Sequence, residues 1–181
     1  MKLPIGPEIA VIQKISAAII HERNVEKLLD NVLSILDSEL GMLRGTFTLR
    51  FGDTLKIESS HGLDDAEKQL GQYHIGEGIT GHVAETRRSH VIPDLRKDSR
   101  FLNRTGSRRA SEALSFVCVP LLHRGQIIGT LSADREMTGD TGSLARDVEL
   151  LEIIANLVAE AAFVCRAEDA EQVALVKENQ R

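Results

Sequence analysis

The sequence contains few aromatic residues and few cysteines, and both shortages exclude classes of function. Among 181 residues there are no Trp, one Tyr and five Phe, which argues against the aromatic stacking platforms that bind single-stranded nucleic acid. Two cysteines are too few for a disulfide framework. No apolar run approaches the ~18 residues that a membrane span needs. We therefore expect one domain of a cytoplasmic protein that does not contact membranes.

Residues that carry catalysis or bind metals are present but scattered along the chain. The histidines show no His-x₃-His spacing, and Cys118 and Cys165 lie far apart in apolar stretches. Cys118 is predicted to pack as a small buried side chain and Cys165 to lie at a dimer interface. No nucleophile, base and orienting group occur together. We expect no enzymatic activity, no metal and no cofactor.

The charge of the chain is unevenly distributed. The net charge is −5, yet residues 87–109, here named the basic segment, carry +6. The acidic remainder would repel nucleic acid, whereas the basic segment would attract anions. Either its arginines bind a small dicarboxylate or phosphate, or the segment is solvated or contacts a partner domain. Phe101 is expected to anchor the segment on the core while Arg100 points inward.

The spacing of apolar residues predicts long helices at both ends of the chain. One helix is expected over residues 8–22 and a second over residues 25–40, with Asn24 as its N-cap and Gly41 at its end. A third helical pattern begins at Gly142 and continues to the end of the sequence. This helix is longer than one small domain covers, so its tail is expected to be a signalling or dimerising stalk.

Between these helices, alternating apolar and polar residues predict strands. Residues 46–51 and 55–58 form one hairpin, and residues 114–122 and 126–133 form a second, more apolar pair. Residues 89–92 are expected to be a short strand. Adjacent hairpins imply an antiparallel sheet with the helices on one face, which is an α+β fold.

Polar residues interrupt the apolar strand pair. Thr130, Ser132 and Asp134 share one face because side chains alternate along a strand. They either line a ligand cavity or form the solvated side of the sheet.

The stretch Gly76-Glu77-Gly78-Ile79-Thr80-Gly81 matches the glycine pattern of dinucleotide-binding loops. That interpretation requires a buried parallel strand before the loop and a long helix after it. Here the preceding strand is short and polar, and the helix predicted over residues 79–87 is barely two turns long. The pattern therefore favours a tight backbone approach where a loop leads into a helix.

The same stretch also resembles a known family. Residues 75–86, Ile-Gly-Glu-Gly-Ile-Thr-Gly-His-Val-Ala-Glu-Thr, resemble the mid-domain signature of GAF sensor domains. Residues 91–94 and 98–104 resemble the loop that follows it, and residues 114–120 and 128–135 resemble the paired core strands. The Arg-Phe-Leu-Asn-Arg and Leu-Ser-Phe-Val-Cys-Val-Pro stretches are most similar to the N-terminal GAF domain of Nif-specific, NifA-type transcription activators.

The resemblance covers about residues 8–166. It implies a GAF domain over residues 1–166 and a helical linker over residues 167–181. It further implies a six-stranded antiparallel sheet, helices on one face, a ligand pocket on the other, and a long C-terminal signalling helix.

In that family the protein continues into an AAA+ ATPase that acts on sigma-54 RNA polymerase, and then into a DNA-binding helix-turn-helix. No Gly-x₄-Gly-Lys-Ser/Thr motif occurs in this sequence, so direct nucleic-acid contact by this part is not expected. The family controls nitrogen fixation and is associated with 2-oxoglutarate sensing or with docking of an anti-activator protein. The sequence lacks the motifs of GAF domains that bind cyclic nucleotides, bilins or iron–sulfur centres, and the cysteine set of free methionine sulfoxide reductases.

These observations lead to one hypothesis about function and an alternative. The first is a sensor that dimerises through its first and last helices and binds a small anion, such as 2-oxoglutarate, between the basic segment and the sheet. Arg100 and Arg104 are predicted to bind the ligand carboxylates, and Phe101 and Phe116 to form the pocket walls. The predicted hydroxyl contacts are Thr80, Ser115 and Ser132. The alternative is a ligand-free module for dimerisation and protein docking.

Overall fold

A computed structural model describes residues 6–109, 111–137 and 141–179, and within them six strands form one sheet. The strand order is β3-β2-β1-β6-β5-β4, and every neighbouring pair is antiparallel. The strands are β1 (Leu43–Phe51), β2 (Thr54–Ser60), β3 (Gln72–His74), β4 (His90–Ile92), β5 (Leu114–His123) and β6 (Gln126–Glu136). The two predicted hairpins, β1–β2 and β5–β6, therefore join through β1 and β6 at the centre of the sheet.

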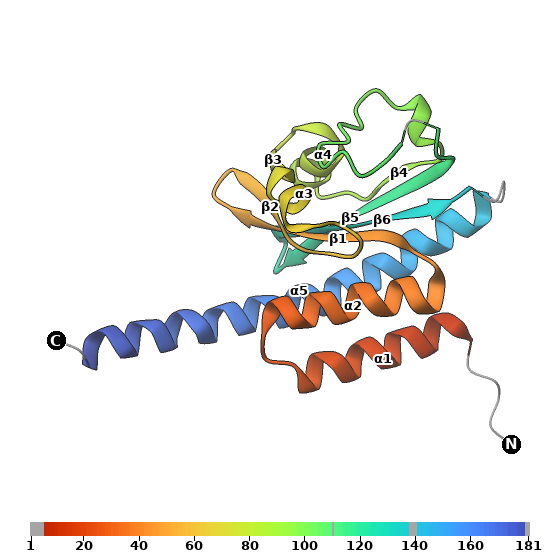
Figure 1. Ribbon diagram of the computed structural model, residues 1–181. Coiled ribbons are helices and arrows are strands. Elements are labelled where there is room, and N and C mark those ends of the chain that lie inside the picture. Colours follow the sequence, from red (N-terminus) through yellow and green to blue (C-terminus); the bar gives the residue numbers. More distant parts are fainter. Residues whose placement is uncertain (1–5, 110, 138–140, 180–181) are drawn as a thin grey trace, which may run out of the picture.

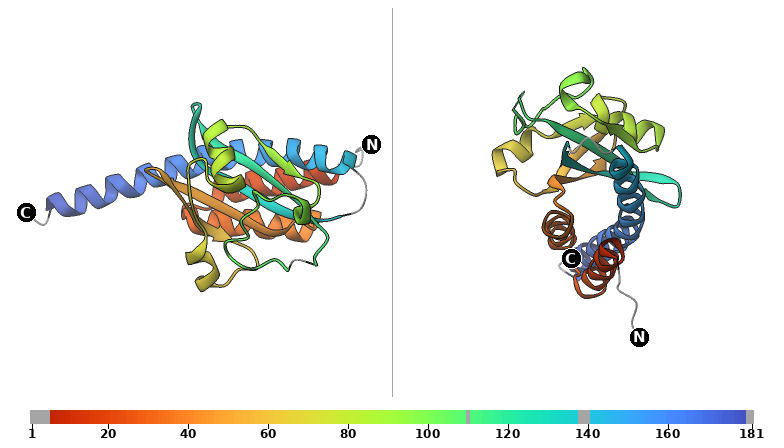
Figure 2. Two further views of the ribbon diagram at one scale, coloured as in Figure 1. Left: turned by 90° about the horizontal axis from the view of Figure 1, so that it is seen from above. Right: turned by 90° about the vertical axis from the view of Figure 1, so that its right-hand side faces the viewer.

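Helices cover both faces of this sheet, but unequally (Figures 1 and 2). The long helices lie on one side: α1 (Pro7–His21), α2 (Val25–Leu40) and α5 (Thr141–Asn179). The other side carries the basic segment and the short elements: α3 (Asp65–Leu70), α4 (Gly78–Thr86) and the 3₁₀ turn η1 (Leu95–Lys97). The predicted α+β fold with a six-stranded antiparallel sheet is confirmed; the long helices lie on one face, as predicted, and the short helices α3 and α4 lie on the other.

The first two helices begin and end where the sequence predicts. The Asn24 side chain accepts a hydrogen bond from the Lys27 amide at 2.9 Å, which caps the start of α2. Gly41 ends α2 with a φ of 64°, a left-handed conformation that glycine adopts without strain. Pro7 occupies the first turn of α1, where its missing N–H removes no helical hydrogen bond.

The main core lies between the long helices and the sheet. Leu29, Leu36, Phe47, Leu131 and Leu151 are among its fully buried side chains. Burying one such side chain stabilises the fold by roughly 1.5–3 kcal/mol. Beyond this core, α5 continues past the rest of the domain (Figure 1). Among the described residues, no helix is both long enough and apolar enough to cross a bilayer.

The glycine-rich stretch forms a close backbone contact at the start of α4. A Cβ added to Gly81 would lie 2.2 Å from the His74 carbonyl oxygen, closer than real atoms approach. Gly78 adopts a φ of 62° next to Leu102. The preceding strand, β3, is antiparallel to β2 rather than part of a parallel sheet. The prediction of a tight backbone approach is confirmed, and the context of a dinucleotide-binding loop is not found here.

Candidate functional site

A small inner cavity lies on the sheet face opposite the long helices. It is lined by strand residues below and by α4 and the basic segment above. Its volume is about 30 Å³, which is room for about two water molecules. The cavity therefore has a defined lining but accepts no metabolite until one of its walls moves.

The floor of the cavity is polar. Thr46, Thr48 and Ser132 line it from β1 and β6, and all three are buried. The hydroxyls of Thr48 and Thr130 lie 2.7 Å apart, and the Thr130 amide donates to the Thr48 hydroxyl at 3.2 Å. Of the two interpretations of the polar strand face, the structure shows a covered face that lines a cavity, not a solvated one.

Aromatic and apolar side chains form the walls. Phe101 and Phe116 meet edge to face, with their ring centroids 5.3 Å apart, a favourable arrangement for aromatic pairs. Ile79 of α4 lies against the same cluster. Tyr73 of β3 closes another side, and burial raises its pKa. The expectation that Phe101 anchors the basic segment on the core is confirmed.

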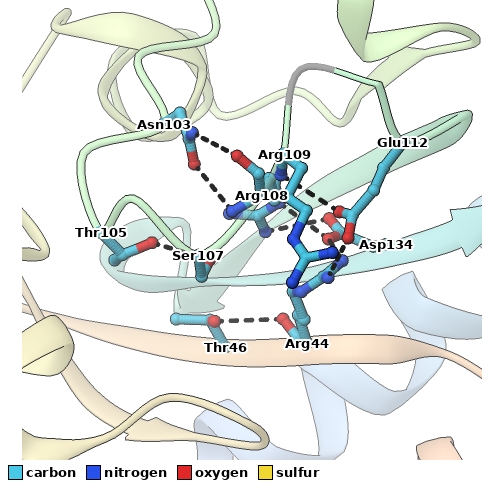
Figure 3. A network of polar contacts seen from close by, with 9 residues as sticks. All are labelled: Arg44, Thr46, Asn103, Thr105, Ser107, Arg108, Arg109, Glu112 and Asp134. Atoms are coloured by element: carbon cyan, nitrogen blue, oxygen red, sulfur yellow. Dashed lines mark hydrogen bonds and ion pairs between the residues drawn. The ribbon is translucent and has the colours of Figure 1, made fainter.

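A buried ion pair marks one end of the cavity (Figure 3). The Arg108 Nε and Nη2 atoms donate to the two Asp134 carboxylate oxygens at 2.7 and 2.9 Å. The Asp134 side chain is fully buried, whereas 12% of the Arg108 side chain is exposed. The Arg108 guanidinium carbon also lies 5.0 Å from the Phe101 ring centroid and 5.6 Å from that of Phe116.

Arg44 is a second cation at the same carboxylate. Its Nη1 lies 3.4 Å from Asp134, and its Nη2 donates to Glu112 at 3.0 Å. Arg44 adopts a φ of 46°, and the β1–β6 register shifts between Leu43 and Thr46. Such bulges redirect side chains next to functional sites, and here the bulge accompanies a guanidinium aimed at Asp134.

The Asn103 side chain holds the backbone that carries Arg108. Its amide group donates to the Arg108 carbonyl oxygen at 2.8 Å and accepts from the Arg108 amide at 3.3 Å. Thr105 and Ser107 are joined through their hydroxyls at 2.9 Å (Figure 3). The end of the basic segment is therefore held by specific hydrogen bonds over the cavity.

The structure brings four of the seven predicted contact residues together. Thr80, Phe101, Phe116 and Ser132 all line the inner cavity. Ser115 lies on the strand between β4 and β6, and its hydroxyl donates to the Pro93 carbonyl oxygen at 2.8 Å. It therefore fixes the start of the loop after β4 and does not line the cavity.

The two arginines predicted to bind the ligand, Arg100 and Arg104, do not line the cavity. Arg100 donates to both carboxylate oxygens of Asp98 and approaches His90, and about half of its side chain is exposed. Arg104 pairs with Glu77 and lies over the Tyr73 ring. The expectation that Arg100 points inward is wrong, because Asp98, two residues before it, offers a closer carboxylate.

Several arginines of the basic segment pair with carboxylates. Arg96 holds Asp94 through two hydrogen bonds, at 2.8 and 2.9 Å, and holds the pKa of that carboxyl far below its usual range. Arg100 lowers the pKa of Asp98 in the same way. The pKa of Glu77 is also lowered, first by the His74 amide and then by Arg104. Four arginines of the basic segment are thus paired with carboxylates: Arg96, Arg100, Arg104 and Arg108.

Two cations that were not predicted from the sequence do line the cavity, Arg44 and Arg108. One sequence signal called for a cation here without identifying which one. Asp134 lies in an apolar strand, and a carboxylate buried there requires a cationic partner. Arg108 belongs to the basic segment, whereas Arg44 lies distant in sequence and reaches Asp134 across the β1–β6 pairing.

Neither cysteine chemistry nor metal chemistry is supported at this site. Cys118 is fully buried, and burial raises the pKa of its thiol to about 12, so it holds its proton at neutral pH. Among residues 6–109, 111–137 and 141–179, no three His, Cys, Asp or Glu side chains gather as metal ligands would. What the cavity offers is hydrogen bonding, aromatic walls and a paired guanidinium.

Comparison with known proteins identifies the family of this chain and its relatives. Residues 24–162 match the family described as "GAF domain". The chain is 39% identical over 163 residues to the nitrogen fixation protein VnfA of Azotobacter vinelandii, covering 87% of this chain and 31% of that protein. It is 32% identical over 177 residues to the Nif-specific regulatory protein of Herbaspirillum seropedicae, covering 96% and 33%.

Solved structures share the fold. The structure described as the A. Aeolicus nlh2 GAF domain in an inactive state superposes with a TM-score of 0.79 at 28% identity, covering 87% of this chain and 96% of that one. The free methionine-R-sulfoxide reductase from Neisseria meningitidis superposes with a TM-score of 0.73 at 19% identity, covering 93% and 97%. At that identity the reductase shows a common fold only. The chain spans about a third of the length of the curated relatives that it matches.

Proposed function

The chain belongs to the GAF domain family, and we propose that it is the regulatory sensor domain of a NifA-type transcriptional activator. Its ligand is a small anion, with 2-oxoglutarate as the first candidate. One observation supports this most directly: the guanidiniums of Arg44 and Arg108 converge on a buried carboxylate at the end of a cavity with a polar floor. Such cations are suited to bind a ligand carboxylate through paired hydrogen bonds.

The strands connect the cavity to the long helix. Phe116 and Ser132 face the cavity, whereas their neighbours Val117 and Leu131 belong to the core that packs against α5. A ligand that shifts β5 or β6 therefore changes the packing of α5. The regulatory effect is a population shift, in which the ligand favours one position of α5 over another.

The relatives support a proposal for the activity of the whole protein. The two curated relatives described above are a nitrogen fixation protein and a Nif-specific regulatory protein. In our proposal, α5 transmits the state of the sensor to an AAA+ ATPase domain of the same protein that acts on sigma-54 RNA polymerase.

Titration calorimetry of the 181-residue chain with 2-oxoglutarate tests the ligand. The wild type is expected to bind, and Arg108→Ala is expected to lose about tenfold or more in affinity, because it removes a charge-assisted contact. Arg88→Ala is the matched control, since Arg88 is an exposed arginine of the same basic segment outside the cavity. Arg100→Ala and Arg104→Ala test the contacts predicted from the sequence. Absence of binding by the wild type would refute the proposal.

A ligand-free module for dimerisation and docking is the second candidate. It is favoured by the small cavity and by apolar side chains exposed on the terminal helices: Ile9 and Ile20 of α1, and Ile153, Leu157 and Val164 of α5. Under this alternative a second copy covers these helices, and an anti-activator docks on the domain.

Sedimentation equilibrium of the wild type and Leu157→Glu tests the dimer. A dimer that Leu157→Glu dissociates supports this interface, and a monomeric wild type contradicts it. Dimerisation without any binding of 2-oxoglutarate would favour the docking module over the sensor.

A further inference from the structure

Two spaces meet at Arg108. The inner cavity holds about 30 Å³, and an outer hollow of about 260 Å³ lies between η1 and the start of β5. Both are lined by Phe101, Asn103 and Arg108. These three residues therefore form the wall between the outer hollow and the inner cavity.

The outer hollow has a positive lining. Its charged side chains are Arg96, Arg108 and Arg109 against Glu112. Arg96 is paired with Asp94 and Arg108 with Asp134, while Glu112 accepts a hydrogen bond from Arg44. These four arginines and three carboxylates leave one net positive charge around the hollow. Clefts lined by charges of one sign raise the local concentration of counter-ions. An anion is thus attracted to the hollow and meets Arg108 there before it reaches the inner cavity.

If Arg108 leaves Asp134, the buried carboxylate still has a counter-ion. A buried carboxylate that loses its only counter-ion is strongly destabilised. Asp134, however, also has the Arg44 guanidinium 3.4 Å away, on β1 rather than on the basic segment. When Arg108 moves, Arg44 stays with Asp134, so only the contacts of Arg108 itself are exchanged.

We propose that Arg108 is a gate held shut by Asp134. In the ligand-free protein, the carboxylate of Asp134 occupies the face of the guanidinium that a ligand carboxylate would use. An anionic group that arrives from the outer hollow takes over Arg108, and the movement of this side chain joins the hollow to the inner cavity. This inference rests on the proposed function, because it requires that an anion binds.

The gate makes an unusual prediction about affinity. Asp134 is an internal competitor for Arg108. The apparent affinity for an anion is therefore lower than the intrinsic affinity, because only the fraction of molecules in which Arg108 is free can bind. Weakening the Asp134–Arg108 pair should therefore strengthen anion binding. A purely structural ion pair predicts the opposite, since its loss would only disorder the site.

Titration calorimetry with 2-oxoglutarate tests this on two variants of the 181-residue chain. Asp134→Asn removes the competing charge and keeps the shape of the side chain. Asn103→Gly removes the two hydrogen bonds that hold the Arg108 backbone, and glycine accepts the φ of 41° at that position. Both variants are expected to bind up to about tenfold more tightly than the wild type, and the control Arg88→Ala is expected to bind equally.

Three outcomes separate the gate from the sensor. Tighter binding by the two variants supports the gate. Binding by the wild type with equal or weaker binding by both variants overturns the gate and leaves the sensor in place. Absence of binding by the wild type and both variants overturns both. Circular dichroism establishes whether each variant is folded. If Asp134→Asn does not fold, the affinity of Asn103→Gly alone supports or overturns the gate.

Discussion

Replacing Gly81 by Ala sets two effects of opposite sign against each other. Alanine in a helix interior is more favourable than glycine by about 1 kcal/mol, so the helical propensity of α4 predicts a gain in stability. In this structure, however, the new Cβ would lie 2.2 Å from the His74 carbonyl oxygen. Ordinary contact requires α4 to move away from β3 by about 1 Å, and overpacking of this kind costs about 1–3 kcal/mol.

We therefore expect Gly81→Ala to lower the free energy of unfolding by about 0–2 kcal/mol, the overpacking cost less the gain in helical propensity. It should also weaken binding of 2-oxoglutarate, because α4 carries Ile79 and Thr80 of the cavity lining. Urea denaturation measures the first effect and calorimetry the second. Ala17→Gly, at an exposed position of α1, calibrates the propensity in this chain and should cost about 1 kcal/mol.

The result that refutes this reasoning is a stabilised Gly81→Ala variant. If Gly81→Ala gained as much free energy of unfolding as Ala17→Gly loses, helical propensity alone would explain both changes. The close approach of α4 to β3 would then have no energetic consequence.

Three further predictions concern a buried pair of hydroxyls, a half-buried histidine and a buried thiol. Thr48→Val should cost about 1–3 kcal/mol of stability because it strips partners from Thr130, and Thr48→Val/Thr130→Val should cost less than the sum of the single variants; additive urea denaturation results would contradict this. Burial and then Arg100 lower the pKa of His90 below 6.5, so the unfolded chain takes up this proton first as pH falls. Stability should therefore decrease below about pH 6.5, less so in His90→Gln; equal slopes would contradict this. Cys118 should resist thiol reagents in the folded protein and react in urea; rapid labelling of the native chain would contradict its burial.

The local sequence pattern was enough to predict most of the fold. The apolar spacing of α2 and its flanking Asn24 and Gly41 act within a few residues, so the helix boundaries could be predicted to within a residue or two. The β5–β6 hairpin was also predicted from local features, its two apolar runs and the turn between them, although β6 ends at Glu136 rather than at residue 133. The predicted boundary at residue 166 between domain and linker stays a prediction, and residues 180–181 lie outside the described part of the chain.

The site was harder to predict because its charges pair at long range. Local pattern cannot distinguish Arg100, which bonds to nearby Asp98, from Arg108, which crosses to Asp134 on another strand. The aromatic walls were easier, since Phe101 was the main apolar anchor of a polar segment. The role of Arg44 could not be predicted from the sequence, because a β-bulge and a left-handed backbone conformation direct its side chain.

The most direct measurement of the central claim is a crystal structure of this chain with 2-oxoglutarate. The account predicts a ligand carboxylate hydrogen-bonded to the Arg108 guanidinium, Asp134 retained by Arg44 alone, and an inner cavity opened toward the outer hollow. Ligand bound elsewhere, with the Arg108–Asp134 pair intact and the cavity still closed, would contradict it.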